Sequence, residues 1–157
     1  MNKIAAASLS TAAVVTANLV GRRYGPQHPR SALWYASLRK PSYTPPGAVI
    51  GAAWMVLDSL LCVAGYRLLT TRPGPVRNAA VAAWGVNVLG IAGFPWVFFG
   101  RKDLGASTAV SGGMLASAAA AVGTSACVDP IAAATEAPLV AWLGFATLLS
   151  EEIWRRN

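Results

Sequence analysis

The sequence predicts an all-α integral membrane protein, a bundle of five transmembrane helices with a long capping segment between the first and the second. Of its 157 residues, 55% are hydrophobic and only 12% are charged, and the mean hydropathy is +0.47. A soluble domain of this length carries about 25% charged residues. The apolar residues form five runs, each long enough to cross a hydrocarbon core about 30 Å thick. The basic residues lie almost entirely between these runs, as they do in loops at a membrane surface, so the net charge of +7 does not indicate nucleic-acid binding.

The first helix is expected over Ile4–Val20. Lys3 and the small residues of this run also resemble a secretory signal peptide. Four more apolar runs follow instead of a soluble domain, so we interpret it as a retained transmembrane helix. The remaining helices, all within one domain over residues 1–157, are expected at Gly47–Leu69, Asn78–Phe99, Leu104–Val128 and Ile131–Ile153. Because the last three connections are short, consecutive helices should run in opposite directions.

The capping segment, residues 21–46, is the only long polar stretch. Five prolines prevent it from forming one continuous helix. Within it, Leu33, Trp34, Tyr35 and Leu38 are apolar residues at roughly helical spacing. We therefore expect a short helix that lies on the bundle.

The distribution of Lys and Arg predicts the orientation in the membrane. Nine of them lie at the end that carries the capping segment and the C-terminus, against four at the other end. The positive-inside rule places the first of these ends in the cytoplasm and the N-terminus outside. Trp96 and Trp154 lie at the same end, where interfacial aromatic residues are expected. Ala-rich helices and many arginines favour a bacterial membrane.

The side chains that usually carry catalysis or bind metals form no cluster in this sequence. Cys62 and Cys127 are isolated, His28 is the single histidine, and no Ser/His/Asp set can be assembled, so neither a metal site nor ordinary side-chain catalysis is predicted. Asp58 is the exception, because it lies midway along the second helix, where an ionisable group by default marks a cavity or an ion path. Asn87 could form a hydrogen bond with it. The alternative is a purely structural aspartate.

Two tryptophans, Trp54 and Trp142, lie within the second and fifth helices, away from the interfaces. Their rings could line a pocket for a flat apolar ligand, or they could simply pack in the core or face lipid. In the fourth helix, Gly112, Ala116 and Ala120 recur every four residues. Small residues at this spacing let another helix approach closely. That helix could belong to the same chain or to a second copy.

Residues Leu33–Pro46 read LWYASLRKPSYTPP, which resembles the WYxxLxKPxWxPP segment of the TspO/MBR family of translocator proteins and tryptophan-rich sensory proteins. Further agreement lies at Trp54, Pro95–Gly100, Trp142 and Ile153–Asn157. The resemblance implies five helices around a pocket that the capping segment covers. It also implies binding of porphyrins such as protoporphyrin IX and haem, with sterols in eukaryotic members, and homodimers in many cases. In some bacterial members the tryptophans that match Trp54 and Trp142 are implicated in light-dependent porphyrin breakdown.

Several positions depart from the family pattern and identify a divergent member. Alignment on Phe98 and Phe99 puts the family's Gln, Asn and Trp of the third helix at Asn87, Ile91 and Phe94. The family's Leu-Asn in the fifth helix becomes Leu149-Ser150, its Pro-Tyr becomes Pro138-Leu139, and its Leu-Tyr in the second helix becomes Leu57-Asp58. No tyrosine remains in the fifth helix, so a sterol is less favoured than a tetrapyrrole.

These observations lead to a membrane receptor or carrier for a flat hydrophobic ligand, with protoporphyrin IX or haem as the expected ligand and no required cofactor. The expected ligand-binding residues are Trp34, Pro45, Pro46, Trp54, Asp58, Asn87, Phe94, Trp142 and Ser150. One alternative is porphyrin-degrading activity at Trp54 and Trp142, and another is a proton-coupled transporter that uses Asp58. The expected partners are the lipid bilayer, the small molecule and a second copy of the chain.

Overall fold

The computed structural model describes residues 1–157 and is entirely helical. The elements are α1 (Lys3–Gly21), α2 (Pro29–Ser37), α3 (Gly47–Thr70), α4 (Pro75–Pro95), the π-helical turn η1 (Trp96–Gly100), α5 (Leu104–Ala126) and α6 (Pro130–Arg156). Five of these helices, with η1 continuing α4, are long and apolar enough to cross a membrane, so the predicted five-helix membrane bundle is confirmed.

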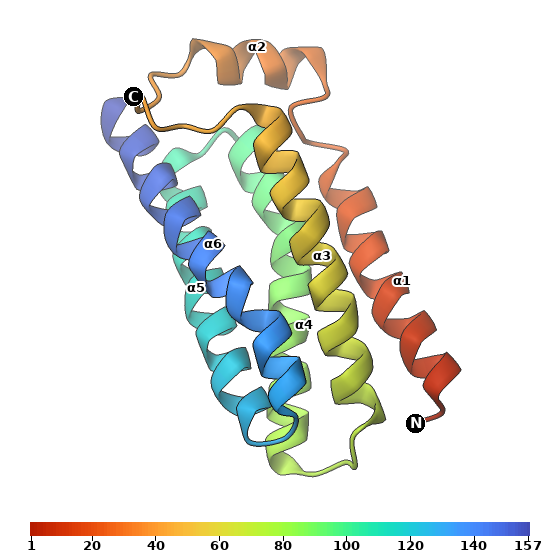
Figure 1. Ribbon diagram of the computed structural model, residues 1–157. Helices are drawn as coiled ribbons and strands as arrows, with labels where there is room; N and C mark the ends of the chain where they lie inside the picture. Colours follow the sequence, from red (N-terminus) through yellow and green to blue (C-terminus); the bar gives the residue numbers. More distant parts are fainter.

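The five long helices alternate in direction, and the short α2 lies across one end of the bundle (Figure 1). We call this end, which also holds the C-terminus, the capped end. Neighbouring helices pack in the closed order α1, α3, α6, α5, α4, with further contacts between α3 and α4. The short helix predicted in the capping segment is therefore present, and it ends at Ser37, before Leu38.

The helix ends differ from the predicted ones for local reasons. Helix α4 begins at Pro75 and not at Asn78 as predicted. The fixed φ of proline suits the first helical position, where the missing N–H would have no acceptor within the helix. The third span, predicted to end at Phe99, is present and reaches Gly100, but it is not α-helical throughout. After Pro95 the chain changes to π-helical spacing, with the Arg101 N–H donating to the Trp96 carbonyl over 2.8 Å. Helix α6 continues to Arg156, where two ion pairs of i,i+4 spacing stabilise its last turn.

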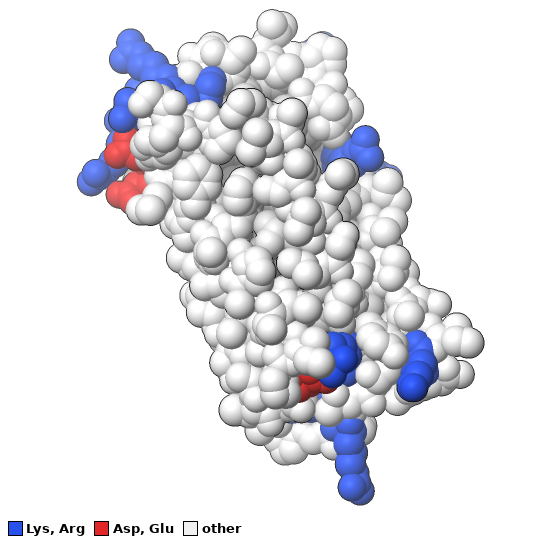
Figure 2. Space-filling view, viewed as in Figure 1, with Lys and Arg blue, Asp and Glu red and all other residues white.

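The surface carries a broad uncharged belt between two charged ends, as Figure 2 shows for one face. Large apolar side chains are exposed within the spans, including Met55 at 71% and Leu89 at 72%. Water would disfavour this exposure, whereas the acyl chains of a bilayer accept it. The lateral surface of the bundle is therefore built to contact lipid.

The interior of the bundle depends on small residues and a few polar contacts. Ser10 of α1 donates to the Cys62 carbonyl over 2.7 Å, and the Trp84 indole of α4 donates to the Leu61 carbonyl over 2.9 Å. Gly65 of α3 lies between these two contacts, because a Cβ there would meet both Ser10 and Trp84. This glycine allows α1, α3 and α4 to approach one another closely.

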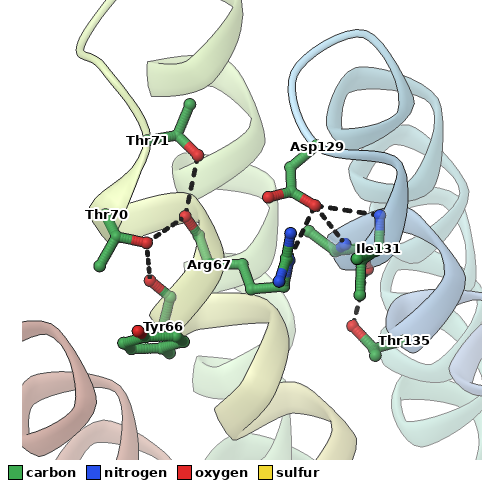
Figure 3. A network of polar contacts seen from close by, with 8 residues as sticks. Tyr66, Arg67, Thr70, Thr71, Asp129, Ile131 and Thr135 are labelled. Carbon is green, nitrogen blue, oxygen red and sulfur yellow. Dashed lines mark hydrogen bonds and ion pairs between the residues drawn. The ribbon is translucent and has the colours of Figure 1, made fainter. Parts of the chain in front are cut away.

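At the end opposite the cap, an ion pair joins α3 to the start of α6 (Figure 3). Arg67 Nε donates to Asp129 Oδ1 over 2.8 Å, and this oxygen also accepts the backbone N–H groups of Ile131 and Ala132. Asp129 is thus both the N-cap of α6 and the partner of Arg67. The hydrogen bond from Arg67 is the largest of the interactions that hold the pKa of the Asp129 carboxyl below its usual range.

Helix α5 packs closely against α6, and one of its three regularly spaced small residues lies at this contact. Ser111 and Thr147 share a hydrogen bond of 2.9 Å, and a Cβ on Gly112 would lie 3.9 Å from Thr147. Ala116 and Ala120 face outward instead. Only Gly112 of this series lies at the contact within the chain, which leaves the other two on the lipid-facing surface.

Candidate ligand-binding site

An apolar groove of about 660 Å³ runs between α3 and α6 near the capped end. This volume lies in the range of about 300–1,000 Å³ that is usual for small-molecule sites. Val56, Pro138 and Ala141 on its walls are exposed on the surface of the bundle, so the groove opens sideways toward lipid. The residues that line it are Pro45, Ala53, Val56, Leu57, Pro138, Ala141, Trp142 and Phe145.

Aromatic rings from three parts of the chain meet at this groove. Trp54 of α3 and Trp142 of α6 lie edge to face, with ring centroids 6.4 Å apart. Trp142 is also 5.7 Å from Phe145, which lies 6.3 Å from Tyr43 of the capping segment. The two tryptophans singled out in the sequence are therefore in direct contact, and the ring series connects the groove to the cap.

The indole N–H of Trp142 is buried and has no hydrogen-bond partner in the protein. Nearly all buried polar groups in folded proteins are paired, so an unpaired donor calls for an explanation. The groove is therefore lined by apolar residues, one of which, Trp142, carries a buried and unpaired N–H.

The capping segment is held over the bundle by aromatic contacts. Trp34 and Tyr35 of α2 lie against Phe98 and Phe99 of η1, with centroid distances of 5.5 to 6.3 Å. Phe94 stacks on Phe98 at 5.6 Å. Burial raises the pKa of the Tyr35 phenol. Trp34 therefore anchors the cap on η1, Phe94 supports η1 from α4, and neither lines the groove.

Two polar side chains, Lys40 and Asn157, fix the remainder of the capping segment. Lys40 donates to the carbonyls of Tyr35 and Leu38 over 2.5 and 3.2 Å, and its ammonium lies 4.5 Å from the centre of the Tyr35 ring. Asn157 at the end of α6 accepts from the Arg39 N–H over 2.9 Å and donates to the Arg39 carbonyl over 3.0 Å. These contacts hold the chain just before Pro45, which forms the capped end of the groove.

The expected site residues fall into separate groups. Pro45 and Trp142 line the groove, Trp54 touches Trp142, and Pro46 is the exposed N-cap of α3. Ser150 is buried in α6 with 5% of its surface exposed. The structure therefore brings together the second- and fifth-helix tryptophans with one of the two cap prolines, and it places the other expected residues away from the groove walls.

Asp58 and Asn87 lie in different surroundings. Asp58 is half-buried, and the side chain that approaches it is Asn18 of α1. Asn87 donates instead to the Ala83 carbonyl over 3.1 Å and to Ser117 Oγ over 3.2 Å. The hydrogen bond that Asn87 could have formed with Asp58 is therefore absent, because α4 turns Asn87 toward α5 while α3 turns Asp58 toward α1.

Glu136 is a candidate that the sequence reasoning missed. It lies in α6 with 1% of its surface exposed, and neither of its carboxyl oxygens has a hydrogen-bond partner. Ser125 Oγ of α5, which approaches it, is also buried and unpaired. Glu136 lies inside the fifth apolar run of the sequence. The rule that singled out Asp58, that an ionisable residue within a transmembrane helix marks a cavity or an ion path, therefore applies to Glu136 as well.

Comparisons with known proteins place these features in a family. The TspO/MBR family profile matches residues 9–155. The human translocator protein is 36% identical over 143 residues, which cover 88% of this chain and 82% of the human protein. The sheep translocator protein is 33% identical over 130 residues, covering 79% and 75% of the two chains. The tryptophan-rich protein TspO of Bacillus cereus is 27% identical over 129 residues, covering 82% and 84%. With the helix bundle, the cap and the paired tryptophans in place, the chain belongs to the TspO/MBR family.

Proposed function

We propose that this membrane protein is a receptor or carrier that binds a flat hydrophobic ligand, a tetrapyrrole such as protoporphyrin IX or haem, between α3 and α6. The observation that carries the proposal is the contact of Trp54 with Trp142 beside an apolar groove of about 660 Å³. A planar macrocycle gains most from aromatic walls, because offset and edge-on ring contacts stabilise it beyond the burial of area.

The direction in which the groove opens supports a carrier of membrane-dissolved molecules. Its mouth faces the lipid-exposed surface, so a hydrophobic ligand could enter from the bilayer without crossing water. The cap closes the groove at Pro45 and is tied to α6 through Asn157. Movement of the cap would therefore change access to the same groove.

A titration with protoporphyrin IX in the dark tests this proposal in detergent-solubilised protein. Binding between the tryptophans should quench their fluorescence saturably, and Trp142→Phe should weaken both the quenching and the affinity. Trp96→Phe is the matched control, because Trp96 is exposed on η1 and lies against Arg101, away from the groove. Unsaturable quenching, or equal loss in both variants, would show that the porphyrin does not bind in this groove.

Porphyrin degradation is the enzymatic alternative, favoured by the Trp54–Trp142 contact at a site for a light-absorbing ligand. The porphyrin would be oxidised and dioxygen would be the oxidant. Illumination of the bound porphyrin in air should then bleach its absorption spectrum faster with wild-type protein than with Trp142→Phe at equal occupancy. Equal bleaching rates in the two proteins would show that Trp142 takes no part in degradation and would support ligand binding only.

Proton-coupled transport is the other alternative, favoured by Asp58, whose Oδ1 is buried without a hydrogen-bond partner. A transporter that uses this carboxyl should show uptake into liposomes that depends on an imposed pH gradient, and Asp58→Asn should abolish that dependence. Uptake that is indifferent to the gradient, or unchanged in the variant, would remove Asp58 from the mechanism.

We further propose that the capped end faces the cytoplasm of a bacterial cell, because nine of the thirteen Lys and Arg residues lie there. Cys127 is exposed at the opposite end and provides a native probe. A membrane-impermeant maleimide should label it in intact cells, whereas Arg39→Cys in a Cys127→Ser background should be labelled only after permeabilisation. The reverse pattern would invert the topology.

A further inference from the structure

A second pocket, of about 540 Å³, lies at the capped end on the side where α1 ends and α5 begins. Its surroundings are strongly basic, unlike the apolar groove between α3 and α6. The residues that line it are Arg23, Tyr24, His28, Pro29, Arg30, Ser31, Phe99, Gly100 and Lys102. None of them belongs to α3 or α6, so the two sites share no residue.

The positive charge around this pocket is not neutralised within the protein. The three ion pairs of the chain involve Arg67, Arg155 and Arg156, and no carboxylate lines the pocket. No ion pair therefore neutralises Arg23, Arg30 or Lys102, and an anion bound among them would be attracted by all three charges.

The first turn of α2 adds donors to the same place. Its N-cap, His28, makes no side-chain capping bond, and no acidic residue lies in the first turn. The hydroxyl of Ser31 donates to the Tyr24 carbonyl over 3.2 Å. The backbone N–H groups of Arg30 and Ser31 have no acceptor within the helix, as at every helix start, and the helix dipole there favours an anion.

The other wall of the pocket is shaped by an unusual backbone conformation. Lys102 has φ of 56°, a left-handed conformation that favours glycine or asparagine over lysine. Its ammonium lies 5.6 Å from the centre of the Trp34 ring. In the same wall, the Tyr24 ring packs on Gly100. A Cβ added to Gly100 would lie 3.0 Å from the tyrosine ring. A lysine held in this conformation brings its charge next to α2.

From these features we propose that the pocket binds a phosphate group. Two guanidinium groups and an ammonium from three different parts of the chain, with free N–H groups beside them, match an anion with several acceptor oxygens. A phospholipid headgroup is one source, since the pocket adjoins the end of α1 at the membrane surface and includes the exposed ring of Tyr24. A soluble phosphate compound is the other source.

The test measures thermal unfolding of the full-length protein in uncharged detergent, as a function of added dihexanoyl phosphatidylglycerol, dihexanoyl phosphatidylcholine or inorganic phosphate. A ligand that binds only the folded state raises the midpoint with its concentration, which yields an apparent affinity. The pocket variant is Arg23→Gln with Arg30→Gln. The matched control is Arg22→Gln with Arg101→Gln, which removes the same charge at the same end outside the pocket.

Phosphatidylglycerol should stabilise the wild type more than phosphatidylcholine, and the pocket variant should bind it roughly a hundredfold more weakly, about tenfold for each charged donor pair lost. The control variant should stay within about threefold of wild type, as screened surface charges do. Stabilisation by inorganic phosphate that the pocket variant loses would also support the site and would identify a soluble source. Equal losses in both variants, or no preference for any phosphate-bearing anion over phosphatidylcholine, would overturn the proposal. Retained protoporphyrin quenching in the pocket variant would show that it is folded.

Discussion

Arg67 and Asp129 form an ion pair of 2.8 Å that joins the last turn of α3 to the first turn of α6. The carboxylate lies where the helix dipole of α6 is positive, and its Oδ1 also accepts two backbone N–H groups there. One side chain therefore both starts a helix and fixes the position of that helix against its neighbour. The same two helices form the groove nearer the cap, so α3 and α6 are joined at one end and hollowed near the other.

This contact predicts a pH-dependent stability. The folded-state pKa of Asp129 is lowered, so its contribution is complete above the unfolded value near 4 and is lost as the pH falls through the lower, folded value. Asp129→Asn should therefore lower the midpoint of thermal unfolding at pH 7, and the difference from wild type should shrink below about pH 4. Asp129→Ala also removes the cap and should cost about 1 kcal/mol more.

The control for this prediction is Asp103→Asn, because Asp103 caps α5 through the Ala106 N–H and has no basic partner. Its effect at pH 7 should be smaller than that of Asp129→Asn. Equal effects of the two substitutions would show that capping alone accounts for the role of Asp129.

Substitution of Gly65 by a larger residue should disturb the packing of α1, α3 and α4. An alanine Cβ there would come within 2.5 Å of Trp84 Cζ2, a rigid ring atom whose indole is held by its hydrogen bond to Leu61. Gly65→Ala should therefore push α1 and α4 away from α3 and cost about 1–3 kcal/mol in unfolding free energy. Gly113→Ala in α5, where a Cβ meets nothing within 4 Å, should be neutral or stabilising by up to about 1 kcal/mol. Both unfolding free energies can be measured by denaturation in detergent. Equal values for the two variants would contradict the prediction.

Loss of the Asn157 side chain should make the capping segment more mobile, because Asn157 ties this segment to the end of α6. Asn157→Ala removes both hydrogen bonds to Arg39 and the one to the Ile153 carbonyl. Hydrogen exchange of residues 38–46 should accelerate, and the porphyrin should dissociate faster, while exchange in the α3 core stays unchanged. Arg156→Ala, which breaks only an exposed ion pair with Glu152, is the control. Unchanged exchange in the Asn157 variant would show that aromatic contacts alone hold the cap.

The five spans and the capping helix could be predicted because lipid leaves so few options. Every backbone polar group within the bilayer must be paired inside its own helix, so a long apolar run is enough to identify a span. The same rule identified the span through Pro95 but not the change to π-helical spacing after it, because proline removes an N–H donor and the helix can change its spacing there without losing the span.

The arrangement of site residues was harder to predict, because it depends on how each helix is rotated. Successive residues differ by about 100° around a helix axis, so a sequence position alone does not show which neighbour a side chain faces. Trp54 and Trp142 do meet, but Asn87 faces Ser117 and Asp58 faces α1. Those directions are set by packing details such as the close approach at Gly65, which no periodic pattern in so uniformly apolar a chain reveals.

Glu136 yields the last prediction, which separates a structural from a functional buried carboxyl. Glu136→Gln keeps the shape of the side chain and removes the group that can ionise, so it should leave the unfolding free energy unchanged or raise it, since both carboxyl oxygens lack partners. Glu136→Ala should instead cost about 2–4 kcal/mol through the cavity it leaves. Paired measurements of stability and of pH-driven uptake then decide the role. A Gln variant that stays stable but loses pH-driven uptake would assign proton binding to Glu136, whereas unchanged uptake would leave it a packing residue of the contact between α5 and α6.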